Sequence, residues 1–316
     1  MKMLSPVAGC RLQVPRRSRV ARTTFNFQPE TCNHSPAFSL LEVLVVVSLL
    51  SLIVLALMAV FNSTQRAFRA SVTQTDVLEG GRATMEMMAA DLRAMAASGG
   101  TGNGAVNFSV SNNASYFQPL VQSLPGSTAS RSSLLQQVFI LNHENTKWWG
   151  VGYAVALNSS DGLYSLYRLQ YPASPGTADP STIFTDATVQ NFFQNPTNGD
   201  SHISHILDGV VHFAVRAHDT SGIWITNGYS FWPTNALRQT LFSVLQGGEV
   251  GFVMHSNDLP ASAELELGVL EDHTLQHAES LPTTALQTQY LSDKSGAVHL
   301  FHQRVSIPNV DPTAYQ

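Results

Sequence analysis

The most constraining feature of this sequence is an uncharged apolar run near its N-terminus. From Val43 to Gln65 there is no charged residue, and the stretch Phe38 to Phe61 consists almost entirely of aliphatic side chains. As a helix, this stretch is about 36 Å long, enough to cross a bilayer core of about 30 Å. It is apolar on every side and ends in polar residues, unlike a helix that packs on a soluble core. The sequence therefore predicts a transmembrane helix from Phe38 to Phe61.

The charge is distributed very unevenly on the two sides of this run. Residues 1–37 carry six of the 17 basic residues and one of the 22 acidic residues, so they have a net charge of +5 and residues 38–316 have a net charge of −10. The positive-inside rule then predicts a cytoplasmic N-terminus and a C-terminal part that lies outside the cytoplasm. The acidic C-terminal part does not favour a nucleic-acid partner.

Both cysteines, Cys10 and Cys32, lie in the basic segment before the run. If that segment is removed, the remaining chain contains no thiol. It then has no disulfide, no thiolate metal ligand and no cysteine nucleophile.

One acidic residue, Glu42, interrupts the apolar run close to its cytoplasmic end. A carboxylate costs on the order of 2.5–3.5 kcal/mol at the bilayer centre and less toward the interface. The side chain therefore either reaches the headgroups or has a function within the membrane.

The string around this acid, Ala-Phe-Ser-Leu-Leu-Glu-Val at residues 37–43, resembles the cleavage and methylation motif of type IV pilins and type II secretion pseudopilins. The resemblance implies that a prepilin peptidase cleaves between Ala37 and Phe38 and methylates the new amine of Phe38. It also implies that Glu42 is the carboxylate that pairs with an N-terminal amine when subunits assemble. Two opposite charges in lipid compensate each other, whereas each alone is costly.

The resemblance implies an α+β, pilin-like fold, in which a long N-terminal helix packs on an antiparallel sheet. The chain would consist of a removable leader (1–37), a transmembrane half of the helix (38–61), an amphipathic half (62–97) and a β-rich head (98–316). Apolar residues recur at helical spacing in the amphipathic half, and the methionines among them are expected to pack on the head. We expect a kink at Gly80-Gly81 and a C-cap and linker in the glycine-rich stretch 98–104.

The pattern beyond residue 104 is one of short strands and polar loops. The expected strands are Leu134–Leu141, Val151–Leu157, Leu163–Gln170, Val210–His218, Leu241–Leu245, Gly248–His255, Ala263–Leu270 and Val298–Ile307. The stretches 111–133, 172–200 and 272–293 are rich in Ser, Thr, Pro, Asn and Gln, and are expected to be loops.

The second part of the head is similar to the J-class minor pseudopilins and PilW-like proteins. The similarity rests on the strand at 206–216, on Asp219, Gly222 and Trp224 after it, on Trp232-Pro233, and on the Leu-Pro segment at 259–267. The helix at 82–93 also resembles these proteins. Pilin-like proteins of the Verru_Chthon cassette type share the same features, and segment 105–205 is not placed by the resemblance.

Several groups of residues are candidates for a catalytic site, a metal site or an interaction surface. They are His202, His205, His212 and His218; His273 and His277; Glu264 and Glu266; Asp258 as a calcium ligand; and Trp148, Trp149 and Trp232 as an interaction surface. Alternation along the strands predicts that His212, His218 and the two glutamates face solvent. The polar composition around His273 and His277 predicts that they lie in a loop. Buried strand positions are the expectation for the tryptophans.

These patterns do not match any nucleophile, zinc-protease or phosphate-binding motif. We therefore expect a structural subunit with no catalytic residue, cofactor or metal. Its expected partners are the prepilin peptidase and other pilin or pseudopilin subunits, which it meets through the N-terminal helix. The leading hypothesis is a minor pseudopilin near the tip of a type II secretion-like pseudopilus. The alternatives are a minor pilin of a type IV pilus, for adhesion or DNA uptake, and a signal-anchored periplasmic enzyme.

Overall fold

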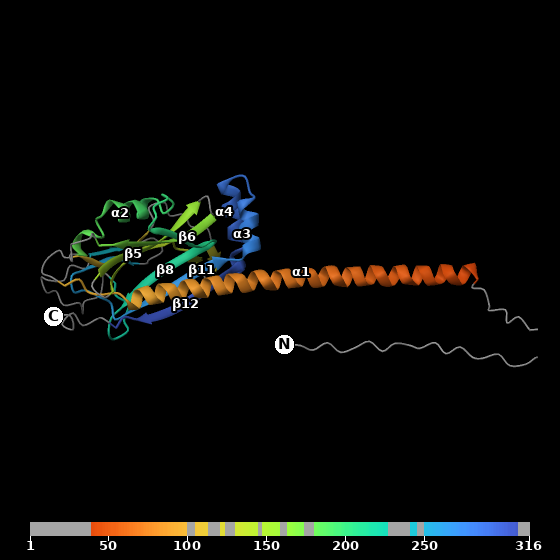
Figure 1. Cartoon of the computed structure of the whole chain (residues 1–316), viewed down its shortest axis with the longest axis horizontal. Helices are drawn as coiled ribbons and strands as arrows, with labels where there is room; N and C mark the ends of the chain where they lie inside the picture. The colour runs from red at the N-terminus through yellow and green to blue at the C-terminus, as the bar shows by residue number, and fades with distance from the viewer. Residues whose placement is uncertain are drawn as a thin grey trace, which may run out of the picture. The chain divides into compact units, whose positions relative to one another are not determined.

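The computed structural model contains one very long helix and a head built largely of antiparallel strands (Figure 1). It describes residues 39–99, 105–112, 121–123, 130–144, 147–158, 163–173, 180–226, 241–244 and 250–308. The chain divides into two units, residues 1–61 and residues 62–316. Residues Ala37 and Phe38, Trp232, and the two cysteines lie outside the described residues.

The long helix, α1, comprises 54 residues, Leu40–Arg93, and is therefore about 80 Å long. Its upper half, residues 40–61, is exposed along its whole length, and its lower half, residues 62–93, belongs to the second unit. Among the described residues there is one helix long and apolar enough to cross a membrane, Leu40–Phe68. This span begins two residues after the predicted start and extends seven residues past the predicted end.

The helix runs without interruption through Gly80-Gly81, so these two glycines do not end it. A Cβ atom on Gly81 would lie 2.2 Å from the ring of Phe301. Glycine at this position lets the helix backbone approach the head, which is a packing role.

The lower half ends at Arg93, four residues before the predicted end. Met95 already forms an isolated bridge with Asn142, and the amide of Ala96 donates to the carbonyl of Leu141. Hydrogen bonds to the head therefore replace the helical pattern before the glycine-rich stretch is reached. Gly99, at φ +71°, lies in the linker and not at the helix C-cap.

The described part of the head forms three antiparallel sheets where one was expected. The strands are β1 (Val106–Asn112), β2 (Val121–Ser123), β3 (Ser130–Ser132), β4 (Gln136–Glu144), β5 (Lys147–Asn158), β6 (Leu163–Pro172), β7 (Ile203–Leu207), β8 (Val210–His218), β9 (Leu241–Val244), β10 (Val250–His255), β11 (Ser262–Leu270) and β12 (Val298–Ser306). The seven-stranded sheet has the order β7-β6-β5-β4-β1-β10-β9, the three-stranded sheet β12-β11-β8, and β2 pairs with β3. Each of the eight predicted strands overlaps one of these.

Three short helices occupy stretches that were expected to be loops. They are α2 (Ala187–Gln194), α3 (Asp272–Glu279) and α4 (Thr284–Asp293), and single 3₁₀ turns lie at Pro180–Thr182 and Ser295–Ala297. Asp186 caps α2 and Thr283 caps α4, each through a side-chain oxygen that accepts a backbone N–H. Both are residue types that favour helix starts, so the caps account for helices in polar sequence.

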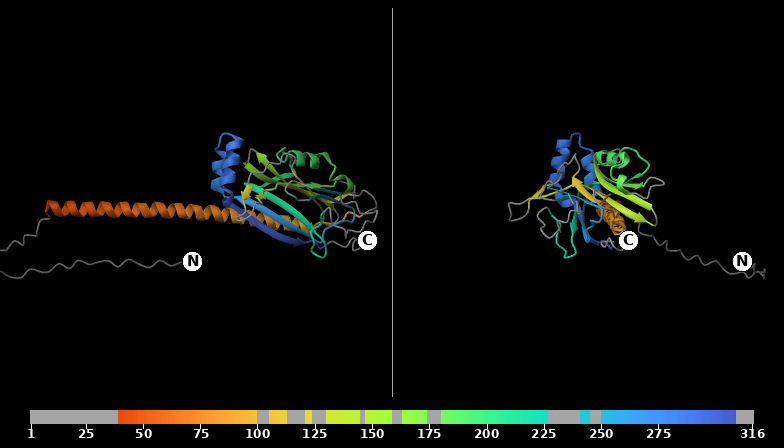
Figure 2. Two further views of the ribbon diagram at one scale, coloured as in Figure 1. Left: turned by 180° about the vertical axis from the view of Figure 1, so that it is seen from behind. Right: turned by 90° about the vertical axis from the view of Figure 1, so that its left-hand side faces the viewer.

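The second unit has layers on both faces of the seven-stranded sheet (Figures 1 and 2). The lower half of α1 and the three-stranded sheet share one hydrophobic core with one face of that sheet. On the other face, α2 contributes Val189 and Phe192 to a second, smaller core. Met85, Met88 and Met95 are at most 4% exposed, which confirms the prediction that the methionine row packs on the head.

Candidate functional site

The start of α1 is built by a serine cap and the acid three residues after it. The Ser39 carbonyl accepts hydrogen bonds from the amides of Glu42 (2.9 Å) and Val43 (3.2 Å), and the Ser39 hydroxyl accepts from Glu42 N (3.2 Å). Ser39 thus satisfies amides that the first turn of any helix leaves unpaired. Glu42 lies in that first turn, where the positive end of the helix dipole favours a carboxylate.

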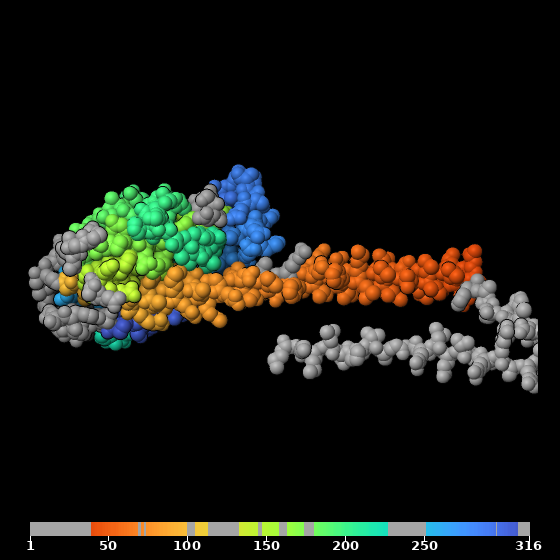
Figure 3. Space-filling view, viewed as in Figure 1, coloured from red at the N-terminus to blue at the C-terminus, as the bar shows by residue number. Residues whose placement is uncertain are grey.

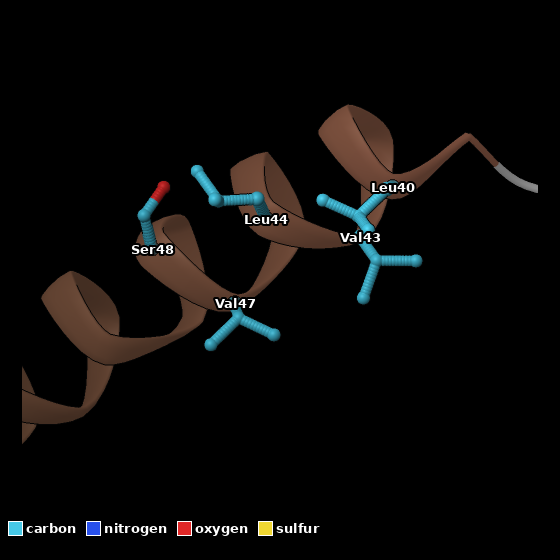
Figure 4. A pocket seen from close by; sticks show the side chains of 5 residues that line it. All are labelled: Leu40, Val43, Leu44, Val47 and Ser48. Carbon is cyan, nitrogen blue, oxygen red and sulfur yellow. The ribbon is translucent and has the colours of Figure 1, made fainter.

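One side of the first three turns forms an apolar hollow. Figure 4 shows Leu40, Val43, Leu44 and Val47 along this side, with Ser48 at its end. The Ser48 hydroxyl donates to the carbonyl of Val45 at 2.8 Å, so the serine presents no unpaired donor. Because these side chains are exposed, this stretch of α1 offers an apolar surface for a lipid chain or another helix.

A buried ion pair fastens the lower half of α1 to the head. The guanidinium of Arg168 on β6 donates to both carboxylate oxygens of Asp91, from Nε and from Nη2, at 2.9 Å each. The Tyr153 hydroxyl on β5 donates to Asp91 Oδ2. Tyr153 and Arg168 are direct partners in the β5–β6 register, which places both side chains under the helix.

Burial of this site is nearly complete. The side chains of Asp91 and Arg168 are 13% and 17% exposed, and Tyr153 is 1% exposed. Burial, reinforced by the negative charge of Asp91, raises the pKa of Tyr153 well above its ordinary value. Tyr153 is therefore a neutral donor. Sequence reasoning missed this site because residues from three elements form it, and neither Tyr153 nor Arg168 has a local motif.

A second polar site lies on one face of the three-stranded sheet, and we call it the polar cluster. It comprises His212, Arg216 and His218 on β8, Glu264 and Glu266 on β11, and His302 on β12. His212 and His218 are 6% and 7% exposed, so the prediction that they face solvent is wrong. These residues do lie on the polar face of the strands, as the alternation predicts. They are buried because charged side chains of the neighbouring strands pack over them.

Arg216 joins the two glutamates of the polar cluster. Its Nη1 atom lies 3.1 Å from Glu264 Oε1 and 2.8 Å from Glu266 Oε1. Hydrogen bonds from His212 and Arg216 lower the pKa of Glu266 to about 2, although burial opposes the shift. Burial also opposes the shift at Glu264, but the hydrogen bond from His302 and the charge of Arg216 lower its pKa overall.

The two buried histidines of the cluster are held differently. The amide of Leu134 donates to Nδ1 of His212, so Nδ1 is an acceptor, and Nε2 faces Glu266 Oε2 at 3.2 Å. Burial, together with the charge of Arg304, lowers the pKa of His218. His212 thus connects β8, β11 and the segment that leads into β4.

Glu264, Glu266 and His302 present one ligand atom each within 4.8 Å of one another, a donor set that the sequence analysis did not single out. The cationic Arg216 is already hydrogen-bonded to both carboxylates. This arrangement matches an ion-pair network better than a metal site, because a cation would compete with a guanidinium for the same oxygens.

His202 and His205 each pair with an aspartate close in sequence. His202 Nδ1 lies 2.7 Å from Asp200, and His205 Nε2 lies 2.8 Å from Asp208, which also accepts from Ser165. In a hydrolase with a Ser-His-Asp triad, the histidine lies between the serine and the acid, whereas here the acid lies between the serine and the histidine. Ser165 is also 0% exposed. This group therefore lacks the geometry of a nucleophile activated by a base.

The other candidates lie in structural positions. His273 and His277 belong to α3 and not to a loop, and the ring of His277 contacts Tyr290 on α4. Trp148 and Trp149 are half-buried strand residues. Asp258 is 2% exposed, and its carbonyl accepts a hydrogen bond from Asn107.

The turn that contributed to the J-class resemblance is well formed. The amide of Gly222 donates to the carbonyl of Asp219 at 3.1 Å, and that of Ile223 donates to the Asp219 carboxylate at 2.7 Å. Gly222 has φ +80°, a conformation that favours glycine. The turn brings Trp224 back beside His218 and places its ring 6.0 Å from the guanidinium of Arg216.

No protein-family model, curated protein or solved structure matches this chain.

Proposed function

We propose that this protein is a structural subunit of the prepilin type, cleaved before Phe38 and assembled as a minor pseudopilin of a type II secretion-like pseudopilus, near its tip. Its activity is polymerisation and not catalysis. Its partners are the prepilin peptidase and neighbouring subunits, which it contacts through the upper half of α1. The inner membrane holds the subunit before assembly.

The observation that carries this proposal is the position of Glu42. It is the only charged residue from Leu40 to Gln65, and it lies in the first turn of an exposed apolar helix. Cleavage before Phe38 would create an ammonium group four residues away, at the positive end of the helix dipole. A positive charge is unfavourable there, so a carboxylate from a neighbouring copy would stabilise it.

The division of α1 into two halves supports the same function. From Ser39 to Asp76, every described side chain is exposed, whereas buried positions recur from Val77 onward. In a bundle of such helices the apolar upper half exchanges lipid contacts for protein contacts, which are similar in hydrophobicity, so the helix can leave the bilayer at little cost. The Asp91 ion pair keeps the head attached to the helix during that transfer.

Mass spectrometry of the mature N-terminus tests the proposal directly. The expected product begins with N-methylated Phe38, when the protein is produced with a prepilin peptidase. An uncleaved leader in the presence of an active peptidase refutes the proposal.

The assembly role of Glu42 needs its own variant. We expect Glu42→Ala to insert into the membrane normally but to be incorporated into filaments at least about tenfold less, because an unpaired ammonium group then remains in an apolar bundle. Ser48→Ala is the matched control: it lies in the same stretch of helix, and its hydroxyl bonds only to the helix's own backbone. Wild-type incorporation of Glu42→Ala would contradict the assembly role even if cleavage occurs.

A further inference from the structure

Strand β12 forms an edge of the three-stranded sheet. It pairs with β11 along its entire length, from Val298 with Leu270 to Ser306 with Ser262, and with no other strand among those the structure describes. In Figure 3 the dark-blue atoms of this last strand reach the surface of the head.

The hydrogen bonds at the two ends of the β11–β12 pair show which backbone groups are free for another strand. The amide of Ile307 donates to the carbonyl of Ala261, and that of Glu271 donates to the carbonyl of Ala297, both at 3.0 Å. Residues of an antiparallel strand alternate between pointing these groups at the partner and away from it. The odd-numbered residues of β12 therefore point toward β11, and the N–H and C=O groups of residues 300, 302, 304 and 306 point outward.

The side chains of β12 alternate with the same period of two, between the two faces of the sheet. Leu300, His302, Arg304 and Ser306 are exposed, whereas Phe301, Gln303 and Val305 are half-buried or buried. Leu300 is 44% exposed. An incoming strand would thus find both free backbone groups and accessible side chains at the same four positions.

The edge also lacks most of the features that protect sheet edges from pairing. Natural edges are kept short, are interrupted by bulges or proline, or are rich in lysine. The edge strand β7 of the seven-stranded sheet follows this rule, with five residues and a register shift. In contrast, β12 has nine residues, an unbroken register, and no proline or lysine.

We propose that β12 is a docking edge for an extended, acidic segment of a partner protein, which adds a fourth strand to this sheet. The ionisable side chains of β12 are His299, His302 and Arg304, and none of them is acidic. His299 and His302 already lie 3.3 Å from Glu271 and 3.0 Å from Glu264. The exposed Arg304, which donates from Nε to the Ser262 hydroxyl, is therefore the cation that an acidic partner would meet. Opposite charges across a strand pair are stabilising, whereas like charges are destabilising. A second copy of β12 is a poor occupant, because it would bring no acidic side chain to Arg304.

The interaction is a form of β-augmentation, in which backbone hydrogen bonds supply affinity and side chains supply selectivity. It does not depend on cleavage before Phe38 or on the role of Glu42. Its failure would leave the proposed function intact, and the reverse also holds.

The probe is a fluorescently labelled synthetic peptide of about eight residues, in which glutamate alternates with valine and threonine. We expect the purified full chain, in detergent micelles, to bind this peptide in a fluorescence anisotropy titration. The same peptide with lysine in place of glutamate should bind at least about fivefold more weakly. A version methylated on alternate backbone nitrogens should not bind, because it cannot complete the ladder of hydrogen bonds.

Leu300→Glu tests the location of the interaction, and Leu286→Glu on α4 is its matched control, since the two leucines are 44% and 46% exposed. Leu300→Glu should weaken binding by about fivefold, because a like charge then faces the peptide, and Leu286→Glu should not. Absence of binding, equal binding of the methylated or lysine peptide, or equal effects of the two substitutions would each overturn the proposal. If the chain forms dimers without the peptide, and Leu300→Glu abolishes them, the edge binds a second copy of the chain. That result would also overturn the proposal.

Discussion

The ion pair that fastens α1 to the head provides the sharpest test of the tertiary structure. Asp91→Asn keeps the shape of the side chain and one acceptor oxygen but removes its charge. Arg168 then remains charged at 17% exposure, with Tyr153 and Gln170 as its nearest described partners. The substitution therefore isolates a positive charge beneath the helix.

The expected magnitude follows from the burial of the pair. Loss of one partner from a fully buried ion pair costs about 3–5 kcal/mol. Because Asp91 and Arg168 retain some exposure, at 13% and 17%, we expect the lower end of that range, about 3 kcal/mol. For a domain of this size, each kcal/mol lowers Tm by about 2–4 °C, so Asp91→Asn should lower Tm by about 6–12 °C.

Thermal unfolding of the full chain in detergent, followed by near-ultraviolet circular dichroism, measures this shift. Glu86→Gln on the same helix is the matched control, since Glu86 is exposed, and it should change Tm by less than about 2 °C. The double variant with Arg168→Gln should be less destabilised than the sum of the two single variants, because both charges are then gone. A shift below about 3 °C for Asp91→Asn, or strictly additive effects, would refute the reasoning.

Two further predictions concern the three-stranded sheet. Glu266 has a folded pKa of about 2 against an ordinary value of 4.5. It therefore contributes at most about 3 kcal/mol of stability above pH 4.5, and this contribution is lost as the pH falls toward 2. Glu266→Gln should flatten the dependence of Tm on pH in this window, and an unchanged slope would contradict the ion-pair network. The lowered pKa of His218 acts in the same direction at higher pH, because the folded state favours the neutral ring, so stability should decline as pH falls below about 6.5, and His218→Gln should reduce this decline. Gly81→Ala should cost about 1–3 kcal/mol in a chemical unfolding titration, because its Cβ would lie 2.2 Å from the Phe301 ring. Gly296→Ala, with open space around it, should cost much less; similar losses for the two would show that the close approach is unimportant.

Local patterns predicted the elements of this fold well. Alternation of apolar and polar residues located eight strands, and the methionine spacing identified the face of α1 that is buried. Both signals are periodic, and burial on one side of an element is what produces them. The helices α3 and α4 were missed because they are only 8 and 10 residues long and their sequence is polar, so the loop composition dominated.

Charged positions were predicted less well than apolar ones. The sequence places His212 and His218 on the polar side of β8, and it places Glu264 and Glu266 on the polar side of β11. It does not show that the two sides coincide, since this requires the β8–β11 register. Solvent exposure was therefore the natural expectation for residues that in fact cover one another.

The sequence by itself determined the long helix, an upper half whose one charged residue is the acid in its first turn, and an antiparallel α+β class. These follow from the composition and periodicity of contiguous residues, which act through local geometry and solvation. Only the tertiary structure decided that the head has separate sheets, that Asp91 meets Tyr153 and Arg168, and that β12 pairs on one side only among the described strands. Those features depend on which distant segments pack together, and many low-energy pairings of strands share the same local pattern.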